Sequence, residues 1–195
     1  NMKLKKLSFL FFFIVFNSFS QSQDALKAST QKLYEANFLM DFEAIAQLSY
    51  PKMVEQIGKE TFLEKTELHY ENEEYRLRYQ LQSVPFQFGP ITKIGQKSFC
   101  VITIRIPKRY FFESKLTLEQ AAEKKTWLQE VNLTKDVTFE PNRNSFNVKM
   151  IATFVAVFDE TTNGEWKFFN FDHAEQLSAF LSIFDENVKS TLRIE

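Results

Sequence analysis

Asn144–Phe158, NSFNVKMIATFVAVF, carries the most regular alternating pattern in the chain. Apolar side chains occupy every even position from Phe146 to Phe158, and the odd positions are more varied. A period of two is typical of a β-strand, because successive side chains point to opposite faces of the sheet. We therefore expect one long strand whose even-numbered face lies on the protein core.

A second strand of similar length is expected over Ser98–Phe112, SFCVITIRIPKRYFF. One of its faces carries Cys100, Ile102, Ile104 and Ile106, and the other carries Phe99, Val101, Thr103 and Arg105. Pro107 has no backbone N–H to donate, so we expect it to bend this strand or to end its regular pairing.

Shorter strands are expected on either side of these two. Tyr75, Leu77, Tyr79 and Leu81 alternate with polar residues, which predicts a half-buried strand. Gly89-Pro90 interrupts Phe86–Ile94, so that segment is interpreted as irregular or as an edge strand. Asn163-Gly164 is a strong hairpin signal ahead of a return strand over Trp166–Phe171.

Helical patterns precede and follow this group of strands. The expected helices run from an Asp24 cap to about Phe38, over Phe42–Leu48, from Pro51 to an interruption at Gly58, over Glu60–Glu73, and from an Asp172 cap through Ala174–Lys189. This order predicts an α+β fold. N-terminal helices would pack on a curved antiparallel sheet, a cone-shaped α+β roll, with a helix at the C-terminus.

Glu113–Arg143 separates the two long strands and is interpreted as an insertion over one end of the sheet. Thr117 begins a helix that is expected to reach about Leu128, and Asp136–Asn144 is polar and rich in turn residues. Long inserted connections often act as functional lids, although decoration of the fold is the other interpretation.

Residues 1–20 have the layout of a secretory signal peptide. A basic start, Met2–Lys6, is followed by the apolar Leu7–Phe16 and by small residues at Ser18 and Ser20. Cleavage is expected after Ser20, which leaves a single domain over residues 21–195 that is secreted or periplasmic. The apolar run is too short for a stable membrane span, which takes about 20 residues.

Composition restricts the function of the exported part. Loss of Lys3, Lys5 and Lys6 with the signal peptide changes the formal charge from −1 to −4, so no nucleic-acid partner is expected. The chain has only 4 Gly and no phosphate-binding glycine loop. Cys100 is the single cysteine, so the domain must be stabilised by its apolar core rather than by disulfides.

Few residues suggest chemistry on their own. His69 and His173 are the only histidines and are interpreted as surface or boundary residues, since neither has metal-ligand spacing to another donor. No metal or other cofactor is expected. Cys100 is interpreted as a small apolar core residue. Arg76, Arg78 and Arg105 are expected on one sheet face, either as a stripe that binds an anion or as a solvated face paired with glutamates.

Three segments resemble the nuclear transport factor two-like, cystatin-like cone superfamily, in the form found in small exported bacterial proteins. They are Leu33–Ile45 (LYEANFLMDFEAI), Tyr50–Glu60 (YPKMVEQIGKE) and Glu165–Phe168 (EWKF). The resemblance implies a cone with an interior pocket, in a fold class that includes isomerases, dehydratases, cyclases and ligand binders. Its isomerases place an acidic base inside the cone, whereas the strand faces expected inside here carry Ile, Val, Phe and Ala.

The resemblance therefore favours an exported, non-catalytic domain that binds a small apolar ligand or a protein partner. The pocket residues that it implies are Tyr34, Phe38, Tyr79, Ile102 and Phe154. The alternative is a lyase or isomerase that acts on a small apolar substrate in the same pocket. Apolar sheet faces also make a homodimer a further expectation.

Overall fold

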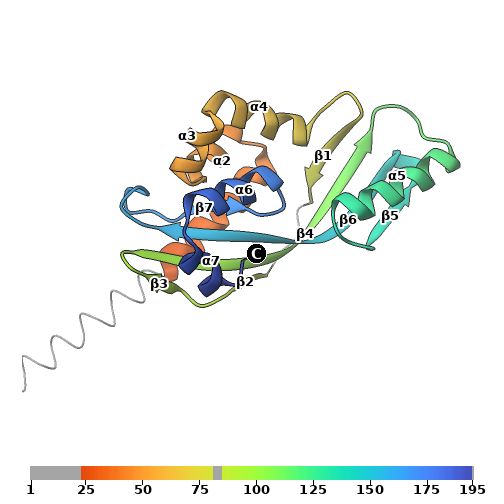
Figure 1. The fold of residues 1–195 in the computed structure, drawn as a ribbon. Coiled ribbons are helices and arrows are strands. Elements are labelled where there is room, and N and C mark those ends of the chain that lie inside the picture. The colour runs from red at the N-terminus through yellow and green to blue at the C-terminus, as the bar shows by residue number, and fades with distance from the viewer. Residues whose placement is uncertain (1–22, 81–84, 195) are drawn as a thin grey trace, which may run out of the picture.

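The computed structural model describes residues 23–80 and 85–194. The expected signal peptide and Leu81, the last residue of the first expected strand, lie outside these ranges. Within them the chain is α+β: an open antiparallel sheet carries helices, and a helix closes the chain (Figure 1). The fold class expected from the sequence is confirmed.

Two long strands form the centre of the sheet. They are β4 (Lys97–Phe112) and β6 (Ser145–Phe158), which pair along their length with Ile102 opposite Phe154 and Ile106 opposite Met150. The strand order is β1-β4-β6-β5, and β7 (Lys167–Asn170) also pairs with β6. Because of this register, the even-numbered residues of β4 and β6 share one face.

The other side of β4 is covered by a broken edge strand. β1 (Tyr75–Tyr79), β2 (Phe86–Phe88) and β3 (Thr92–Ile94) pair with successive parts of β4. Gly89 lies against β4, where an added Cβ would come within 3.0 Å of the Val101 carbonyl oxygen. This close approach explains the glycine, and the edge strand expected between Phe86 and Ile94 is confirmed.

Pro107 does not end the regular pairing of β4, so that alternative of the expectation is wrong. Residues 108–111 continue the pairing with β6 beyond Pro107, which itself lies opposite Lys149. The Pro107 carbonyl accepts the Gln80 N–H at 2.9 Å, so it faces the broken edge. In an antiparallel ladder the N–H of a residue points to the same side as its C=O. The missing donor therefore faces the edge, and the β4–β6 ladder remains intact.

The N-terminal helices follow most of their sequence signals. The expected cap at Asp24 is wrong, because Gln23 is already helical and Asp24 lies inside the helix. Residues 23–39 are helical, α2 (Phe42–Leu48) begins at Asp41, whose side chain accepts the Ala44 N–H at 3.0 Å, and α3 (Pro51–Ile57) begins with its proline. Gly58, with φ of 89°, separates α3 from α4 (Lys59–Tyr70). Figure 1 shows α2, α3 and α4 grouped toward one end of the long strands.

The insertion lies at the opposite end (Figure 1). Thr117 and Gln120 form a reciprocal capping box for α5 (Leu118–Val131), which confirms the expected helix. The following stretch is only partly a turn: β5 (Val137–Glu140) adds a strand to the edge of β6, and a short 3-10 turn, Pro141–Arg143, leads into β6.

The C-terminal helix is divided. α6 (Ala174–Ile183) ends before Phe184, and Asp185 caps α7 (Glu186–Leu192) by accepting the Val188 N–H at 3.0 Å. The expected cap at Asp172 is wrong, because the N-cap of α6 is His173, which makes no side-chain capping bond. None of the helices in residues 23–80 and 85–194 combines the length and apolarity of a membrane span.

Helices cover the even face of the sheet and part of its odd face, where Arg105, Lys149 and Ile151 stay exposed. The even face of β4 and β6 packs with Leu26 and Leu33 of the first helix and with Leu128 of α5. The odd face packs with Phe180 and Val188 of the last two helices. α5 therefore covers one end of the even face, and the first helix covers another part of it.

Candidate functional site

A cleft opens on the even face of the sheet, beside α5. It has a volume of about 280 Å³ and is called the lysine cleft below. Its lining residues come from the end of α4, from β1, β4, α5 and β6, and from the turn before α6: His69, Tyr75, Lys108, Tyr110, Trp127, Val131, Asn132, Met150, Asp172 and His173. Segments far apart in the sequence therefore meet in one concave site.

Lys108 is the unexpected residue of this cleft. It is the next even-numbered residue of β4 after Ile106, so the strand register places it on the core face, between Tyr79 of β1 and Val148 of β6. Its exposed fraction is 5%. Burial lowers the pKa of its amine to about 8, and the nearby carboxylate of Asp172 opposes that change.

The Lys108 ammonium has little compensation for its burial. It lies 5.5 Å from the centroid of the Tyr79 ring, a cation–π contact. Its Nζ donates no hydrogen bond and forms no ion pair with any residue that the structure describes. The Nζ is not fully enclosed, because it borders the open cleft, where water or a ligand can reach it.

Asp172 is the only carboxylate among the cleft-lining residues in the described part of the chain. The residue as a whole is exposed, but the surrounding protein shields its carboxylate from water. This shielding raises the pKa of Asp172 to about 6, and the Lys108 charge opposes the change. The two side chains thus influence each other through space without forming an ion pair.

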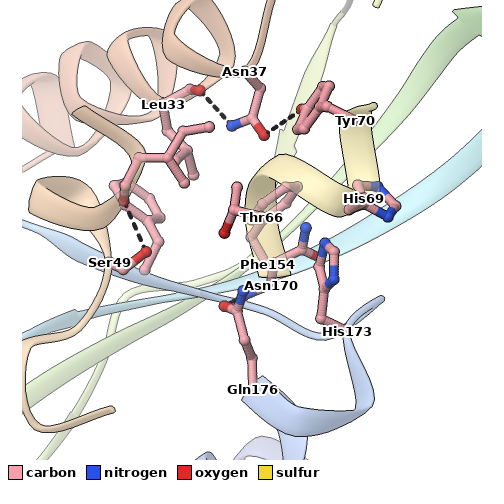
Figure 2. Close-up of a pocket in the computed structure, with 12 residues that line it drawn as sticks. Leu33, Asn37, Ser49, Thr66, His69, Tyr70, Phe154, Asn170, His173 and Gln176 are labelled. Carbon is pink, nitrogen blue, oxygen red and sulfur yellow. Dashed lines mark hydrogen bonds between the residues drawn. The ribbon is translucent and has the colours of Figure 1, made fainter. Parts of the chain in front are cut away.

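His69 and His173 meet at the edge of the cleft. The centroids of their rings lie 4.7 Å apart in an edge-to-face arrangement (Figure 2). Burial, then His173 and then Lys108, lower the pKa of His69 well below its usual value. Burial and then Lys108 lower the pKa of His173 to about 4. Both rings are therefore neutral near pH 7. Both residues are partly buried, in agreement with their interpretation as boundary residues, but their contact with each other was not predicted.

Aromatic side chains form one wall of the cleft. The Tyr75 ring lies 5.1 Å from the Tyr110 ring and 5.8 Å from the Trp127 ring, centroid to centroid. The Tyr110 hydroxyl donates to Asn132 Oδ1 at 3.2 Å. Because Trp127 and Asn132 belong to the insertion, that segment contributes directly to the site.

A second, much smaller cavity lies behind the histidines, with a volume of about 30 Å³. His69 and His173 line both spaces. Figure 2 shows them among the residues around the smaller one. Asn37 is held there by two 2.7 Å hydrogen bonds, one donated to the Leu33 carbonyl and one accepted from the Tyr70 hydroxyl. A space of this size holds about one water molecule, so of these two spaces the lysine cleft is the one with room for a ligand.

The five pocket residues expected from the resemblance all belong to the apolar core of the even face. Tyr34 and Tyr79 lie together, with their ring centroids 5.7 Å apart, and the Tyr34 hydroxyl donates to the Gln80 carbonyl at 3.5 Å. Ile102 is fully buried opposite Phe154, which lines the small cavity. Phe38 is partly buried and packs against the same core.

Other candidate residues have structural partners. The arginines expected on one sheet face each pair with an acid: Arg76 with Glu113, Arg78 with Glu71, and Arg105 with Asp136. Burial raises the pKa of the Cys100 thiol to about 11. Within residues 23–80 and 85–194, no three His, Cys, Asp or Glu side chains are grouped so that they could hold a metal ion.

Lys108, Asp172, His69 and His173 are the functional candidates that sequence reasoning missed. The position of Lys108 could have been read from the sequence. The two-residue period of Cys100–Ile106 continues through Pro107 and places Lys108 on the core face. Asp172, His69 and His173 come together only through tertiary packing, so the sequence gives no local signal for their proximity. Comparisons of the chain with protein-family models, with curated proteins and with solved structures gave no match. Function must therefore be inferred from the chemistry of the cleft.

Proposed function

We propose that the protein is an exported ligand-binding domain of the cone type, and that the lysine cleft takes a small amphipathic molecule. One observation carries the proposal: an open cleft of about 280 Å³ joins an aromatic wall to a few converging ionisable groups. Binding sites for small molecules are concave and mostly apolar, with a small number of polar groups that orient the ligand.

The shape of the interior supports a ligand rather than a purely structural role. The centre of the even face is filled by its own side chains, such as Ile102 and Phe154. The cleft alongside α5 keeps space next to Trp127 and Met150, where an apolar group would be shielded from water. We therefore propose that the ligand binds at the edge of the core, beside the insertion.

A blocking substitution tests this proposal. Val131 lines the cleft near the end of α5, so Val131→Trp should fill part of the space and weaken binding of the neutral fluorophore N-phenylnaphthylamine about tenfold. Leu118→Trp, at the exposed start of the same helix, is the matched control and should leave the affinity unchanged. Absence of binding to the unmodified protein, or an equal loss in both variants, would contradict the proposal.

The export part of the proposal has its own test. Residues 1–20 have the pattern of a signal peptide, and the N-terminal sequence of the protein recovered outside the cytoplasm should begin at Gln21. Recovery of a chain with an intact Met2 end would contradict export. Association of two copies is a separate prediction, which sedimentation analysis of the exported protein tests.

A lyase or isomerase is the second candidate function. It is favoured by the neutral imidazoles of His69 and His173, which lie in the same cleft as Lys108 and Asp172. Neutral imidazoles are in their basic form near pH 7, although the low pKa of His173 makes it a weak base, and an ammonium next to them would stabilise a developing oxyanion. On this alternative, the protein should speed deuterium exchange next to the carbonyl of a small apolar ketone in D₂O. His173→Asn should abolish that acceleration, which would be absent from the outset in a pure binding protein.

A further inference from the structure

We propose that the molecule bound in the lysine cleft is a monocarboxylate with an apolar body, and that the Lys108 ammonium binds its carboxylate. This inference rests on the proposed function, because it concerns the same cleft. It adds the chemical class of the ligand and names the side chain that recognises it.

The first support is the missing partner of Lys108. The side chain is 5% exposed and lines the cleft, yet the described residues supply its ammonium with only the face of the Tyr79 ring. The next residue of β4, Arg109, is also buried, but it has a charged partner. Both terminal nitrogens of Arg109 donate hydrogen bonds to Glu140, at 3.1 and 3.2 Å. A ligand carboxylate would give Lys108 the corresponding partner.

The second support is the charge of the groups that surround Lys108. The facing imidazoles of His69 and His173 are neutral near pH 7, and burial raises the pKa values of Tyr75, Tyr79 and Tyr110, so these phenols are neutral too. Lys124 of α5 lies over the Trp127 ring, but its charge is paired with Glu74. Glu175, whose charge acts on His173, forms an ion pair with Lys65 on the α4 side.

Among the residues that the structure describes around the cleft, Asp172 therefore remains as the one anion that competes with a bound carboxylate. It makes no ion pair with Lys108 within the described chain, and although the residue as a whole is exposed, the surrounding protein shields its carboxylate. Its position leaves the ammonium available while it weakens the attraction for an anion. Removal of its charge should therefore strengthen carboxylate binding, which provides an independent test of the same geometry.

The third support is the apolar wall next to the cation. Tyr75, Trp127 and Met150 border the cleft from β1, α5 and β6. An aliphatic or aromatic body of the ligand would lie against them while its carboxylate contacts Lys108. The site suits an amphipathic acid better than a small hydrophilic anion, because such an anion would leave this wall without a partner.

The experiment compares octanoate with octanol, which share an apolar chain and differ in charge. Calorimetric titration of the protein near pH 7 should show octanoate binding at least tenfold more tightly. Lys108→Met should remove that advantage, leaving the octanol affinity within about threefold. Lys149→Met, which removes an exposed lysine on β6, is the control and should change neither affinity. Lys108→Arg should retain a preference for octanoate.

Two further measurements keep the test independent of folding. Asp172→Asn should raise the octanoate affinity several-fold near pH 7 and leave octanol unchanged. The octanoate affinity should fall as the pH rises through about 8, where the Lys108 amine loses its proton. Thermal unfolding of each variant confirms that the native fold is present.

The possible failures are distinguishable. If octanoate and octanol bind with equal affinity and Lys108→Met changes neither, the carboxylate inference is overturned while the cleft remains a binding site. An equal loss in Lys108→Met and Lys149→Met also overturns it, because a general surface charge would then explain the binding. If neither molecule binds and N-phenylnaphthylamine does not bind either, the proposed function itself is contradicted.

Discussion

The ring of His69, at the end of α4, lies 4.7 Å from the ring of His173, which begins α6. This contact joins two helices that are distant in the chain, and it separates the lysine cleft from the small cavity behind it. The two imidazoles cannot both be charged without repulsion at short range, in a position already close to Lys108. The contact is therefore sensitive to acid.

The histidine contact should make the protein less stable as the pH is lowered. An unfolded histidine titrates near pH 6.5, whereas His173 in the folded protein titrates at about 4. Between these values the unfolded chain binds more protons, so the free energy of unfolding falls as the pH falls. We expect His173 to account for roughly 2 kcal/mol of that loss. Urea unfolding followed by fluorescence at several pH values measures it.

His173→Asn should reduce this slope between about pH 6.5 and 4. Carboxylates contribute to acid unfolding of any protein, so the comparison of interest is the difference between the two proteins rather than either curve alone. Parallel curves for His173→Asn and the unmodified protein would contradict the burial of a neutral ring at this contact.

Lys108→Met should make the folded protein more stable near pH 7. The Lys108 amine titrates at about 8 in the folded protein and near 10.4 when unfolded, so the charged form is disfavoured by folding. The cost is fully present below pH 8 and disappears as the pH rises through about 10.4. We expect a gain of about 2 kcal/mol from the substitution near pH 7. Denaturant unfolding at pH 7 and near 10.5 measures it.

Lys149→Met is the control for that gain, since Lys149 is exposed on the adjacent strand and should change stability by no more than about 0.5 kcal/mol. If Lys108→Met is more stable and also loses the preference for octanoate, then Lys108 is kept for binding at a cost in stability. If Lys108→Met were instead destabilised, the ammonium would have a partner in the folded protein and the carboxylate inference would lose its first support.

The fold was largely predictable because its signals are local and strong. Regular alternation marks β4 and β6, and Asp41, Pro51, Gly58 and Thr117 mark helix boundaries by capping or by backbone geometry. The mistakes at Asp172 and at the end of α6 concern which of several capping residues is used. The sequence offers both Asp172 and Asp185, and tertiary packing decides that only Asp185 caps a helix.

The site was less predictable than the fold. Lys108 could have been assigned to the core face by continuing the period of β4, but doing so requires that Pro107 be tolerated within the strand. That tolerance depends on Pro107 facing the broken edge, which is a property of the neighbouring strand. The histidine contact carries no local signal, because it is created only when α4 and α6 pack together.

Cys100 should behave as a buried core residue. Its side chain is inaccessible, its thiol lies 3.3 Å from the Gly89 carbonyl oxygen, and burial raises its pKa to about 11. A thiolate is the reactive form, so a disulfide reagent should label the folded protein far more slowly than the urea-unfolded protein near pH 8. Comparable labelling rates in the two states would show that the edge formed by β2 and β3 opens readily.

Tyr50 and Asp159 should make a strongly stabilising hydrogen bond next to the apolar core on the odd face of the sheet. The Tyr50 hydroxyl donates to Asp159 Oδ2 at 2.7 Å, and the Asp159 side chain is fully buried. The backbone N–H and the hydroxyl of Thr161 donate to the other carboxylate oxygen. These donors and the Lys97 charge outweigh burial and hold the pKa of Asp159 below its usual value.

Tyr50→Phe removes one donor and leaves a buried carboxylate oxygen without it. We expect a loss of about 1–3 kcal/mol in the free energy of unfolding near pH 7, measured by urea denaturation. Tyr34→Phe is the matched control, because its half-buried hydroxyl makes only a 3.5 Å contact with the Gln80 carbonyl, and its loss should be about 0.5 kcal/mol or less. Similar losses in both variants would mean that the lost aromatic hydroxyl, rather than the buried Asp159 carboxylate, determines the cost. A larger loss for Tyr50→Phe that shrinks at low pH, where Asp159 becomes protonated, would identify the charged hydrogen bond as its source.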